Sequence, residues 1–124
     1  MITIRRAGKN DLAGIKKLIA DYPHHLMSEI PSASRFFVAI DDKKIIGCCA
    51  LDIYSKRIAE VRSLAVDKKY HKHGIGTQLV KKCVSLAKEK DIKEIVVITS
   101  RPNLFSSLGF GTFQGEKLAL FKKL

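Results

Sequence analysis

The sequence predicts a mixed α/β fold, with a mostly antiparallel sheet that contains one parallel pair of strands. Two apolar runs, at 36–40 and 45–54, are separated by a short polar turn, which indicates an antiparallel hairpin. A further strand is predicted at 58–66, and a buried strand at 94–99 follows a long amphipathic helix. Because a helical crossover joins these last two strands, we expect them to be parallel.

The beginning of the chain is predicted to form one strand and one helix. Residues 2–5 form a short strand, and apolar residues then recur at helical spacing over 12–19. Asn10 or Asp11 can cap this helix, which we expect to end near Pro23 because proline lacks a backbone N–H.

The connecting and C-terminal segments carry weaker patterns. Residues 24–35 are polar and contain proline, which indicates an irregular connection with one short helical turn around 26–30. A proline at the first position of 102–108, with Gly109 after it, is typical of a short helix. Residues 117–122 can supply a final strand.

The stretch at 60–91 combines a strand, a basic loop with two glycines and a long helix. Gly74 and Gly76 let the backbone turn sharply and approach a ligand without a Cβ in the way. From Thr77, apolar residues recur every three or four positions, which predicts a helix over 77–90 with a buried stripe.

A helix that begins directly after a glycine loop presents unpaired N–H groups, and these attract phosphate oxygens. Lys68, Lys69 and Lys72 add positive charge beside the loop. The pattern therefore predicts a pyrophosphate cradle. The alternative is a tight strand-to-helix turn flanked by solvated lysines, because glycine pairs before helices are common.

Composition and charge bound the class of protein. The 124 residues suffice for one domain, and no apolar run approaches the roughly 20 residues that a membrane span needs. The N-terminus lacks the apolar core of a signal peptide, so we expect a cytoplasmic protein that binds no membrane. The formal net charge of +11 invites a nucleic-acid interpretation. The lysines are dispersed, however, so we expect a solvated basic surface that attracts an anionic cofactor and no nucleic acid.

Cysteine and histidine usage indicates neither a disulfide framework nor a metal site. Cys48 and Cys49 are adjacent in a strand, so their side chains point to opposite faces. We expect one of them in the core and the other facing a cleft.

Residues 64–80 (LAVDKKYHKHGIGTQLV) resemble the acetyl-CoA loop of the GNAT N-acetyltransferase superfamily, and 104–110 (LFSSLGF) resembles its closing motif. Residues 59–66 (AEVRSLAV) and 36–51 (FFVAIDDKKIIGCCAL) are similar to the amino-acid acetyltransferase branch that contains N-acetylglutamate synthase. The resemblance implies one domain over 1–124, with helices on both faces of the sheet and a splayed parallel strand pair. It also implies acetyl-CoA as cosubstrate and no metal.

The resemblance assigns the cofactor contacts mainly to the end of the strand and to the glycine loop. His71 stands where the superfamily usually has Arg or Gln, although imidazolium groups at 71 and 73 could assist an anion. The implied cofactor-binding residues are Leu64, Ala65, Val66, His71, Lys72, His73, Gly74, Ile75, Gly76, Thr77 and Asn103.

Glu60 aligns with the glutamate that some GNAT enzymes use as the general base, which accepts the proton of the acceptor amine. The alternative is a carboxylate paired with Lys56 or Arg57. Phe105 stands where many relatives carry the tyrosine that protonates the departing thiolate. The thiolate then leaves unassisted, or it takes a proton from water or from one of three side chains, Ser100, Ser106 and Tyr54.

Arg62 lies two residues after Glu60, so strand alternation places both on the same face. A guanidinium there could grip the acceptor's carboxylate in bidentate fashion, and Arg101 is a second candidate. Arg5 and Arg35 are weaker ones. The alternative for Arg62 is a salt bridge with Glu60.

These residues predict an N-acetyltransferase that transfers acetyl from acetyl-CoA directly to a small amine, with an amino acid such as glutamate favoured. In GNAT folds the segment at 24–35 lies over the acceptor site, which would make it a specificity loop and not an ordinary connection. The alternatives are a non-catalytic acyl-CoA-binding domain, or a GNAT enzyme acting on a protein lysine, a protein N-terminus or a polyamine. Many relatives pair through their C-terminal strands, so a homodimer is one expectation.

Overall fold

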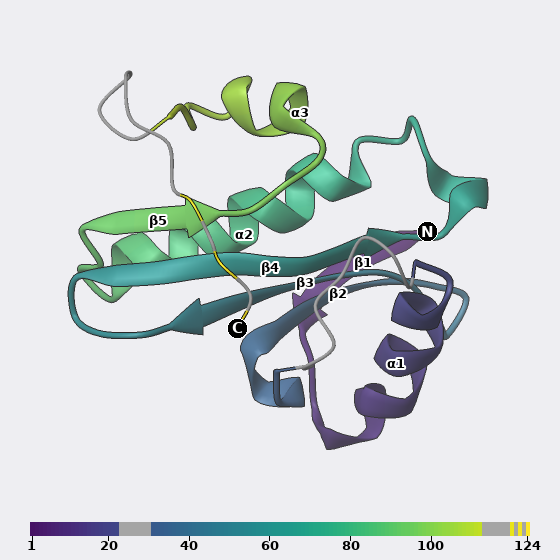
Figure 1. Ribbon diagram of the computed structural model, residues 1–124. Helices are drawn as coiled ribbons and strands as arrows, with labels where there is room; N and C mark the ends of the chain where they lie inside the picture. Colours follow the sequence, from purple (N-terminus) through teal and green to yellow (C-terminus); the bar gives the residue numbers. More distant parts are fainter. Residues whose placement is uncertain (23–30, 113–119, 121, 123) are drawn as a thin grey trace.

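The computed structural model describes residues 1–22 and 31–112, together with 120, 122 and 124 (Figure 1). The predicted turn around 26–30, and most of the predicted strand at 117–122, lie outside these residues. The elements in chain order are β1 (Ile2–Arg6), α1 (Leu12–Ala20), β2 (Phe36–Asp41), β3 (Lys44–Ile53), β4 (Ile58–Val66), α2 (Ile75–Glu89), β5 (Glu94–Val97) and α3 (Pro102–Ser106), with short 3-10 turns at Lys9–Asp11, Ala33–Arg35 and Lys68–Tyr70.

The strands form one mixed sheet in the order β1-β2-β3-β4-β5. Neighbouring strands are antiparallel from β1 to β4, and β4 and β5 are parallel, which confirms the predicted sheet. The hairpin between β2 and β3 turns at Asp42 and Lys43, whose φ values of +50° and +66° are those of a tight two-residue hairpin turn.

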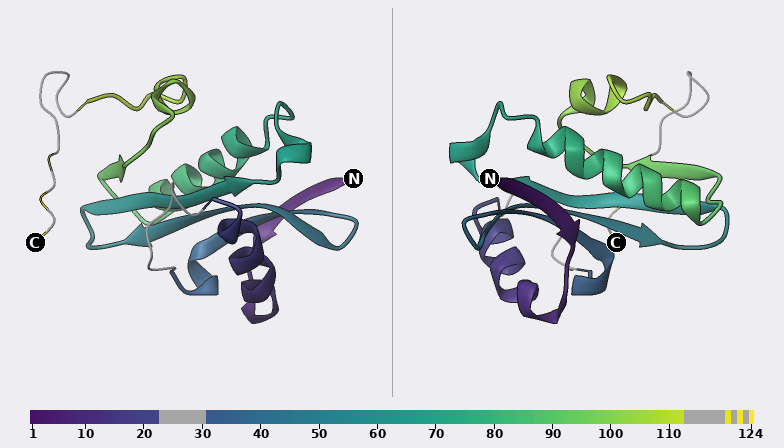
Figure 2. Two further views of the ribbon diagram at one scale, coloured as in Figure 1. Left: turned by 45° about the vertical axis from the view of Figure 1, so that its right-hand side comes forward. Right: turned by 180° about the vertical axis from the view of Figure 1, so that it is seen from behind.

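Helices cover both faces of this sheet, as Figure 2 shows, with α2 and α3 on one side and α1 on the other. The core under α2 includes Cys49, and the core under α1 includes Cys48. Both cysteines are 0% exposed, so the prediction that one of them faces a cleft is wrong. The physical reason is that helices pack against both faces of β3.

The helix α1 has its predicted position but not its predicted cap, since the side chain of Asp11 makes no capping hydrogen bond to it. Instead Asp11 Oδ2 accepts a hydrogen bond from the Gly8 N–H at 2.7 Å. The same oxygen lies 2.7 Å from Arg5 Nη1. Asp11 therefore secures the short turn before the helix, and it engages Arg5.

A bulge interrupts β4 just after its pairing with β5 ends. Position 48 of β3 pairs with 65 of β4, and position 50 pairs with 62. An advance of two residues along β3 therefore corresponds to three residues along β4. Ser63 has a φ of +57°, which a residue other than glycine adopts rarely. The extra residue reverses the alternation of faces, so Val61 belongs to the core under α2 and Ala65 to the core under α1.

The parallel ladder of β4 and β5 ends where Val61 pairs with Val97. β5 stops there, two residues before the predicted end of the 94–99 strand, whereas β4 continues to Val66. Within the described residues, the edge of β4 over 62–66 therefore has no strand beside it on that side. The two strands diverge, as the resemblance implied.

The helix α2 begins at Ile75, two residues before the predicted start at Thr77. Gly74 at its N-cap has a φ of +73°, a left-handed conformation that favours glycine. Ile75 and Gly76 consequently belong to the first helical turn and not to the loop. The helix α3 is also shorter than the predicted range of 102–108.

We predict that Gly47→Ala lowers the free energy of unfolding by about 1–3 kcal/mol, because the added methyl overpacks the layer between β3 and α2. A Cβ at Gly47 would lie 3.1 Å from Leu79 Cδ1, 3.2 Å from Ile75 Cγ2 and 3.3 Å from Ala39 Cβ. Urea titration measures the change. The control is Gly111→Ala, where an added Cβ meets nothing within 4 Å. Equal stability of the two variants would contradict the close packing.

Candidate active site

A cleft of about 890 Å³ opens where β4 and β5 diverge. The end of β4, the loop before α2, the first turn of α2, the segment after β5 and α3 all contribute to its walls. The predicted site residues that line it are Glu60, Arg62, Leu64, Ala65, Val66, His71, Lys72, Gly74, Ile75, Gly76, Thr77 and Arg101.

Two predicted cofactor-binding residues, His73 and Asn103, are exposed and lie outside the cleft lining. The ring centroid of His73 lies 6.2 Å from that of Tyr70. Asn103 is part of α3, where its carbonyl accepts a hydrogen bond from the Ser107 N–H at 3.3 Å. The cleft lining includes Tyr22 and Tyr70, which no sequence motif singled out.

The first turn of α2 forms the wall best suited to an anion. Ile75, Gly76 and Thr77 line the cleft, and first-turn N–H groups have no acceptor within their own helix. Nothing lies within 4 Å of a Cβ placed on Gly74, so its left-handed φ, and not lack of space, is what favours glycine there. Lys72 adds a positive charge to the same wall.

His71 is tied to the end of β4. Its Nε2 lies 2.9 Å from the carbonyl oxygen of Val66, a geometry in which this nitrogen carries the proton and donates it. The hydroxyl of Tyr22 donates to the same oxygen at 2.6 Å and lies 3.4 Å from His71 Nε2. Burial raises the pKa of Tyr22. The side chain of His71 therefore ties the loop to the end of β4 and lies beside Tyr22, the second residue after α1.

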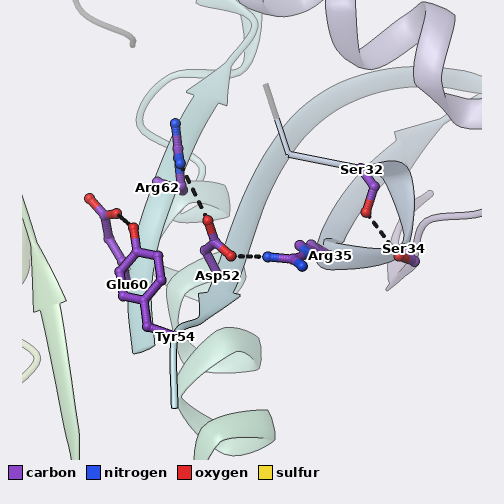
Figure 3. Close-up of polar contacts among 7 residues, drawn as sticks. All are labelled: Ser32, Ser34, Arg35, Asp52, Tyr54, Glu60 and Arg62. Atoms are coloured by element: carbon purple, nitrogen blue, oxygen red, sulfur yellow. Dashed lines mark hydrogen bonds and ion pairs between the residues drawn. The ribbon is translucent and has the colours of Figure 1, made fainter. Parts of the chain in front are cut away.

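At the other end of the cleft, Glu60 is only 6% exposed and accepts a hydrogen bond from the hydroxyl of Tyr54 (Figure 3). This hydrogen bond is the main reason why the pKa of Tyr54 is raised to about 12. The predicted pairing of Glu60 with Lys56 or Arg57 is wrong, since the ion pair that the structure gives Arg57 is with Glu94, at 2.8 Å.

Asp52 lies between two arginines, and the sequence analysis did not identify it. It is 9% exposed, pairs with Arg35 on one side, and lies 3.3 Å from Arg62 Nη1 on the other (Figure 3). Among the residues that the structure describes, Arg62 thus forms its ion pair with Asp52, where the alternative prediction had Glu60. Hairpin register could have revealed this, because it sets Asp52 opposite Glu60 and Ala50 opposite Arg62.

The segment after β5 and α3 form the wall that faces β4 across the cleft. The exposed side chain of Arg101 lies on this wall, and so does Phe105, which is 4% exposed and gives it an apolar surface. Of the predicted proton donors, Ser100 lines the cleft. The hydroxyl of Ser106 instead donates to the carbonyl of Pro102 at 3.0 Å.

The cysteines offer no activated nucleophile. Burial raises the pKa of Cys48 to about 12, and a hydrogen bond from Cys83 together with burial raises that of Cys49. Both thiols are therefore protonated at neutral pH. The described residues contain no group of three or more His, Cys, Asp or Glu placed to hold a metal ion. None of the described helices is long and apolar enough to span a membrane.

The chain belongs to the acetyltransferase (GNAT) family, whose profile matches residues 10–110. This membership agrees with the divergent strand pair and with the glycine-bearing loop at the start of α2.

Three curated relatives are similar to this chain. An uncharacterized N-acetyltransferase of Chlorobaculum tepidum is 37% identical over 81 residues, which cover 65% of this chain and 52% of the relative. An amino-acid acetyltransferase of Mycobacterium tuberculosis is 28% identical over 121 residues, which cover 90% of this chain and 70% of the relative. Human N-alpha-acetyltransferase 30 is 39% identical over 83 residues, which cover 60% of this chain and 23% of the relative. The chain thus spans about half the length of the first relative and under a quarter of the third.

Among solved structures, that of Rv2747 from Mycobacterium tuberculosis in complex with CoA and NLQ is similar to this chain, with a TM-score of 0.80. The two are 28% identical, and the match covers 89% of this chain and 74% of that one.

We predict that Cys48 and Cys49 resist a disulfide reagent such as DTNB in the folded protein, because both are 0% exposed and protonated. Labelling at pH 8 should be at least about a hundredfold slower than in urea, where the thiols are accessible. Thiol release measured by absorbance gives both rates. Rapid labelling of either cysteine in the folded state would contradict the closed cores.

Proposed function

We propose that the protein is an acetyl-CoA-dependent N-acetyltransferase that transfers acetyl directly to the amine of a small acceptor, with an amino acid such as glutamate favoured. The observation that carries this proposal is the single cleft that joins the first turn of α2 to Glu60. One end offers backbone donors for phosphate oxygens, and the other offers a carboxylate for an amine. Similarity to an amino-acid acetyltransferase and to a structure bound to CoA supports the same assignment.

The diphosphate of CoA would bind at the first turn of α2, where N–H groups and the charge of Lys72 converge. The pantetheine arm would then follow the edge of β4 over 64–66, which lines the cleft and lies beyond the end of β5. Peptide groups along such an edge pair readily with the amides of an extended ligand. This placement brings the thioester toward the bulge at Ser63, close to the end of the cleft that Glu60 lines.

Glu60 is the general base in this proposal. It lines the cleft beyond the point where the thioester would lie, and its ionised carboxylate can accept the proton of an acceptor ammonium. The freed amine then attacks the thioester carbonyl. Holding the amine and the thioester in one cleft supplies much of the rate enhancement, because it removes the entropy of bringing them together.

The departing thiolate does not receive a proton from Phe105, whose ring has no hydroxyl. Of the alternative donors, Tyr54 is bonded to Glu60 and Ser106 to the carbonyl of Pro102, which leaves Ser100 on the cleft wall. Assistance is also not essential, because a thiol with a pKa of about 8.5 is a good leaving group near neutral pH.

Two arginines support an acceptor that carries carboxylates. Arg62 lies beside Glu60 on β4, and Asp52 holds its guanidinium at 3.3 Å. Arg101 presents an exposed guanidinium to the cleft from the opposite wall. Glu60 and Arg101 provide for the amine and one carboxylate of an amino acid, and the Arg62 guanidinium, which Asp52 already holds, adds positive charge that favours a second carboxylate.

A second candidate is acetylation of a protein N-terminus, which the similarity to human N-alpha-acetyltransferase 30 favours. The two functions differ in the charge of the acceptor. A peptide N-terminus presents no α-carboxylate beside its amine, so it would leave Arg62 and Arg101 without a partner in the acceptor. A non-catalytic acyl-CoA-binding domain is the third alternative.

We predict that Gly74→Glu weakens the binding of CoA at least about tenfold, because the new carboxylate lies beside the diphosphate and repels it. Isothermal titration calorimetry with CoA measures the dissociation constant. The matched control is Gly74→Gln, which has the same size and the same strain at φ +73° but no charge. Affinity equal to that of the wild type in Gly74→Glu would exclude this placement of the diphosphate.

We predict that Glu60→Gln lowers kcat/KM by about 10²–10⁴, because the amide cannot accept a proton, and that CoA affinity stays unchanged. A thiol-release assay with acetyl-CoA and a panel of amino acids, polyamines and basic peptides gives the rates. The control is Glu94→Gln, which removes a carboxylate at the start of β5 that pairs with Arg57 at 2.8 Å.

The panel also decides between the candidate functions. Turnover of peptides or polyamines with none of amino acids would refute the amino-acid acceptor. Binding of acetyl-CoA with no turnover of any acceptor would favour a non-catalytic domain. An undiminished rate in Glu60→Gln would remove Glu60 from the chemistry.

A further inference from the structure

Two carboxylates lie directly opposite each other on neighbouring strands. The register of β3 and β4 pairs Asp52 with Glu60, and the two residues are 9% and 6% exposed. Like charges at opposed positions of an antiparallel ladder destabilise it, and burial increases the effect. Each carboxylate therefore needs its own partner.

The partners of Asp52 are cationic. Arg35 contacts Oδ1 and Arg62 contacts Oδ2, so both oxygens are engaged by guanidinium groups. Asp52 therefore has no oxygen left for a substrate, and its contact fixes the direction of Arg62.

The partner of Glu60 is neutral and reaches the surface. The hydroxyl of Tyr54 donates to Glu60 Oε1, and the residue is 55% exposed (Figure 3). Tyr54 follows directly after β3, and its phenol spans the distance from the nearly buried carboxylate to solvent. The charged groups around this contact are Asp52 from β3 and Arg62 from β4. On the β5 side the register partner of Glu60 is Val96, which is apolar.

We propose that Tyr54 is a positioning residue for Glu60, and that it holds one carboxylate oxygen so that the other faces the acceptor amine. The inference rests on the proposed function, because it takes Glu60 as the general base.

The proton balance of this step is simple. The acceptor ammonium gives its proton to Glu60, which becomes neutral. The neutral carboxyl group then releases this proton to water or to a buffer base, while Tyr54 keeps its own proton and stays bonded to Oε1. Glu60 returns to its starting state, and only N–H and O–H bonds change.

Tyr54 suits this role because it stays a hydrogen-bond donor over the whole working range of pH. Its pKa is raised to about 12, chiefly by the hydrogen bond to Glu60, so the phenol is not ionised near neutrality. A neutral donor stabilises the ionised carboxylate and keeps it ready to accept a proton.

The decisive variant is Tyr54→Phe, which keeps the ring and removes the hydroxyl. We expect kcat to fall at least about tenfold while KM for both substrates stays within about twofold, since Tyr54 is not among the residues that line the cleft. This split between kcat and KM distinguishes the positioning of the base from a general loss of structure, which would weaken binding as well.

The control is Ser55→Ala in the adjacent turn. Ser55 Oγ accepts hydrogen bonds from the N–H groups of Arg57 and Ile58, at 3.0 and 3.2 Å, so its loss loosens the same hairpin without touching Glu60. An equal loss of kcat in Ser55→Ala would show that Tyr54 acts only through stability. A kcat unchanged in Tyr54→Phe would overturn the inference.

A measurement without turnover separates this inference from the proposed function. Carbon-13 NMR of labelled glutamate carboxyl groups at neutral pH, with Glu60→Gln for assignment, reports on the hydrogen bond to Glu60 directly. We expect the Glu60 carboxyl resonance to move in Tyr54→Phe and to stay in place in Ser55→Ala. An unchanged resonance in Tyr54→Phe would overturn the inference, whereas absence of turnover in the wild type would overturn the proposed function alone.

Discussion

The parting of β4 from β5 after residue 61 is the constraint on which the rest of the structure depends. A strand edge without a neighbour leaves peptide groups unpaired, which is costly inside a protein and a hazard at its surface. Here the bulge at Ser63 redirects β4 at that point, and a cleft of about 890 Å³ lies beside the open edge. The polar groups that the sheet leaves unused are thereby available to an extended ligand.

The fold places part of the positive charge of the chain on α2 and on the loop that precedes it. The net charge of +11 includes lysines on the outer face of α2 and in the loop that precedes it. Exposed charges at this density create a positive field that raises the local concentration of an anionic cosubstrate, an effect that salt screens. The N–H groups of the first turn of α2 act over a shorter range, so in the proposed binding mode they would fix the position of the diphosphate.

Much of this arrangement could be predicted because it follows from local chemistry. Alternation and helical spacing located the hairpin, β4 and α2, and the glycine loop located one wall of the cleft. The sequence did not reveal contacts between distant segments, such as Arg35 with Asp52 or Tyr22 with the carbonyl of Val66. Those depend on register and on the docking of α1, which no single motif encodes. The start of α2 at Ile75 was not predicted, because the predicted start at Thr77 was taken from the spacing of the apolar residues. In the structure Gly74, with a φ of +73°, is the N-cap, so the helix begins directly after it.

The contacts of His71 and Tyr22 with the carbonyl of Val66 have a consequence for affinity. A phosphate-binding loop that must order itself on binding loses conformational entropy, and that loss subtracts from the free energy of association. In this chain the side chain of His71 already ties the loop to the end of β4, and Tyr22 bonds to the same carbonyl. If the loop binds the diphosphate of CoA as proposed, this contact lowers the entropy lost on binding, because the loop is held in place beforehand.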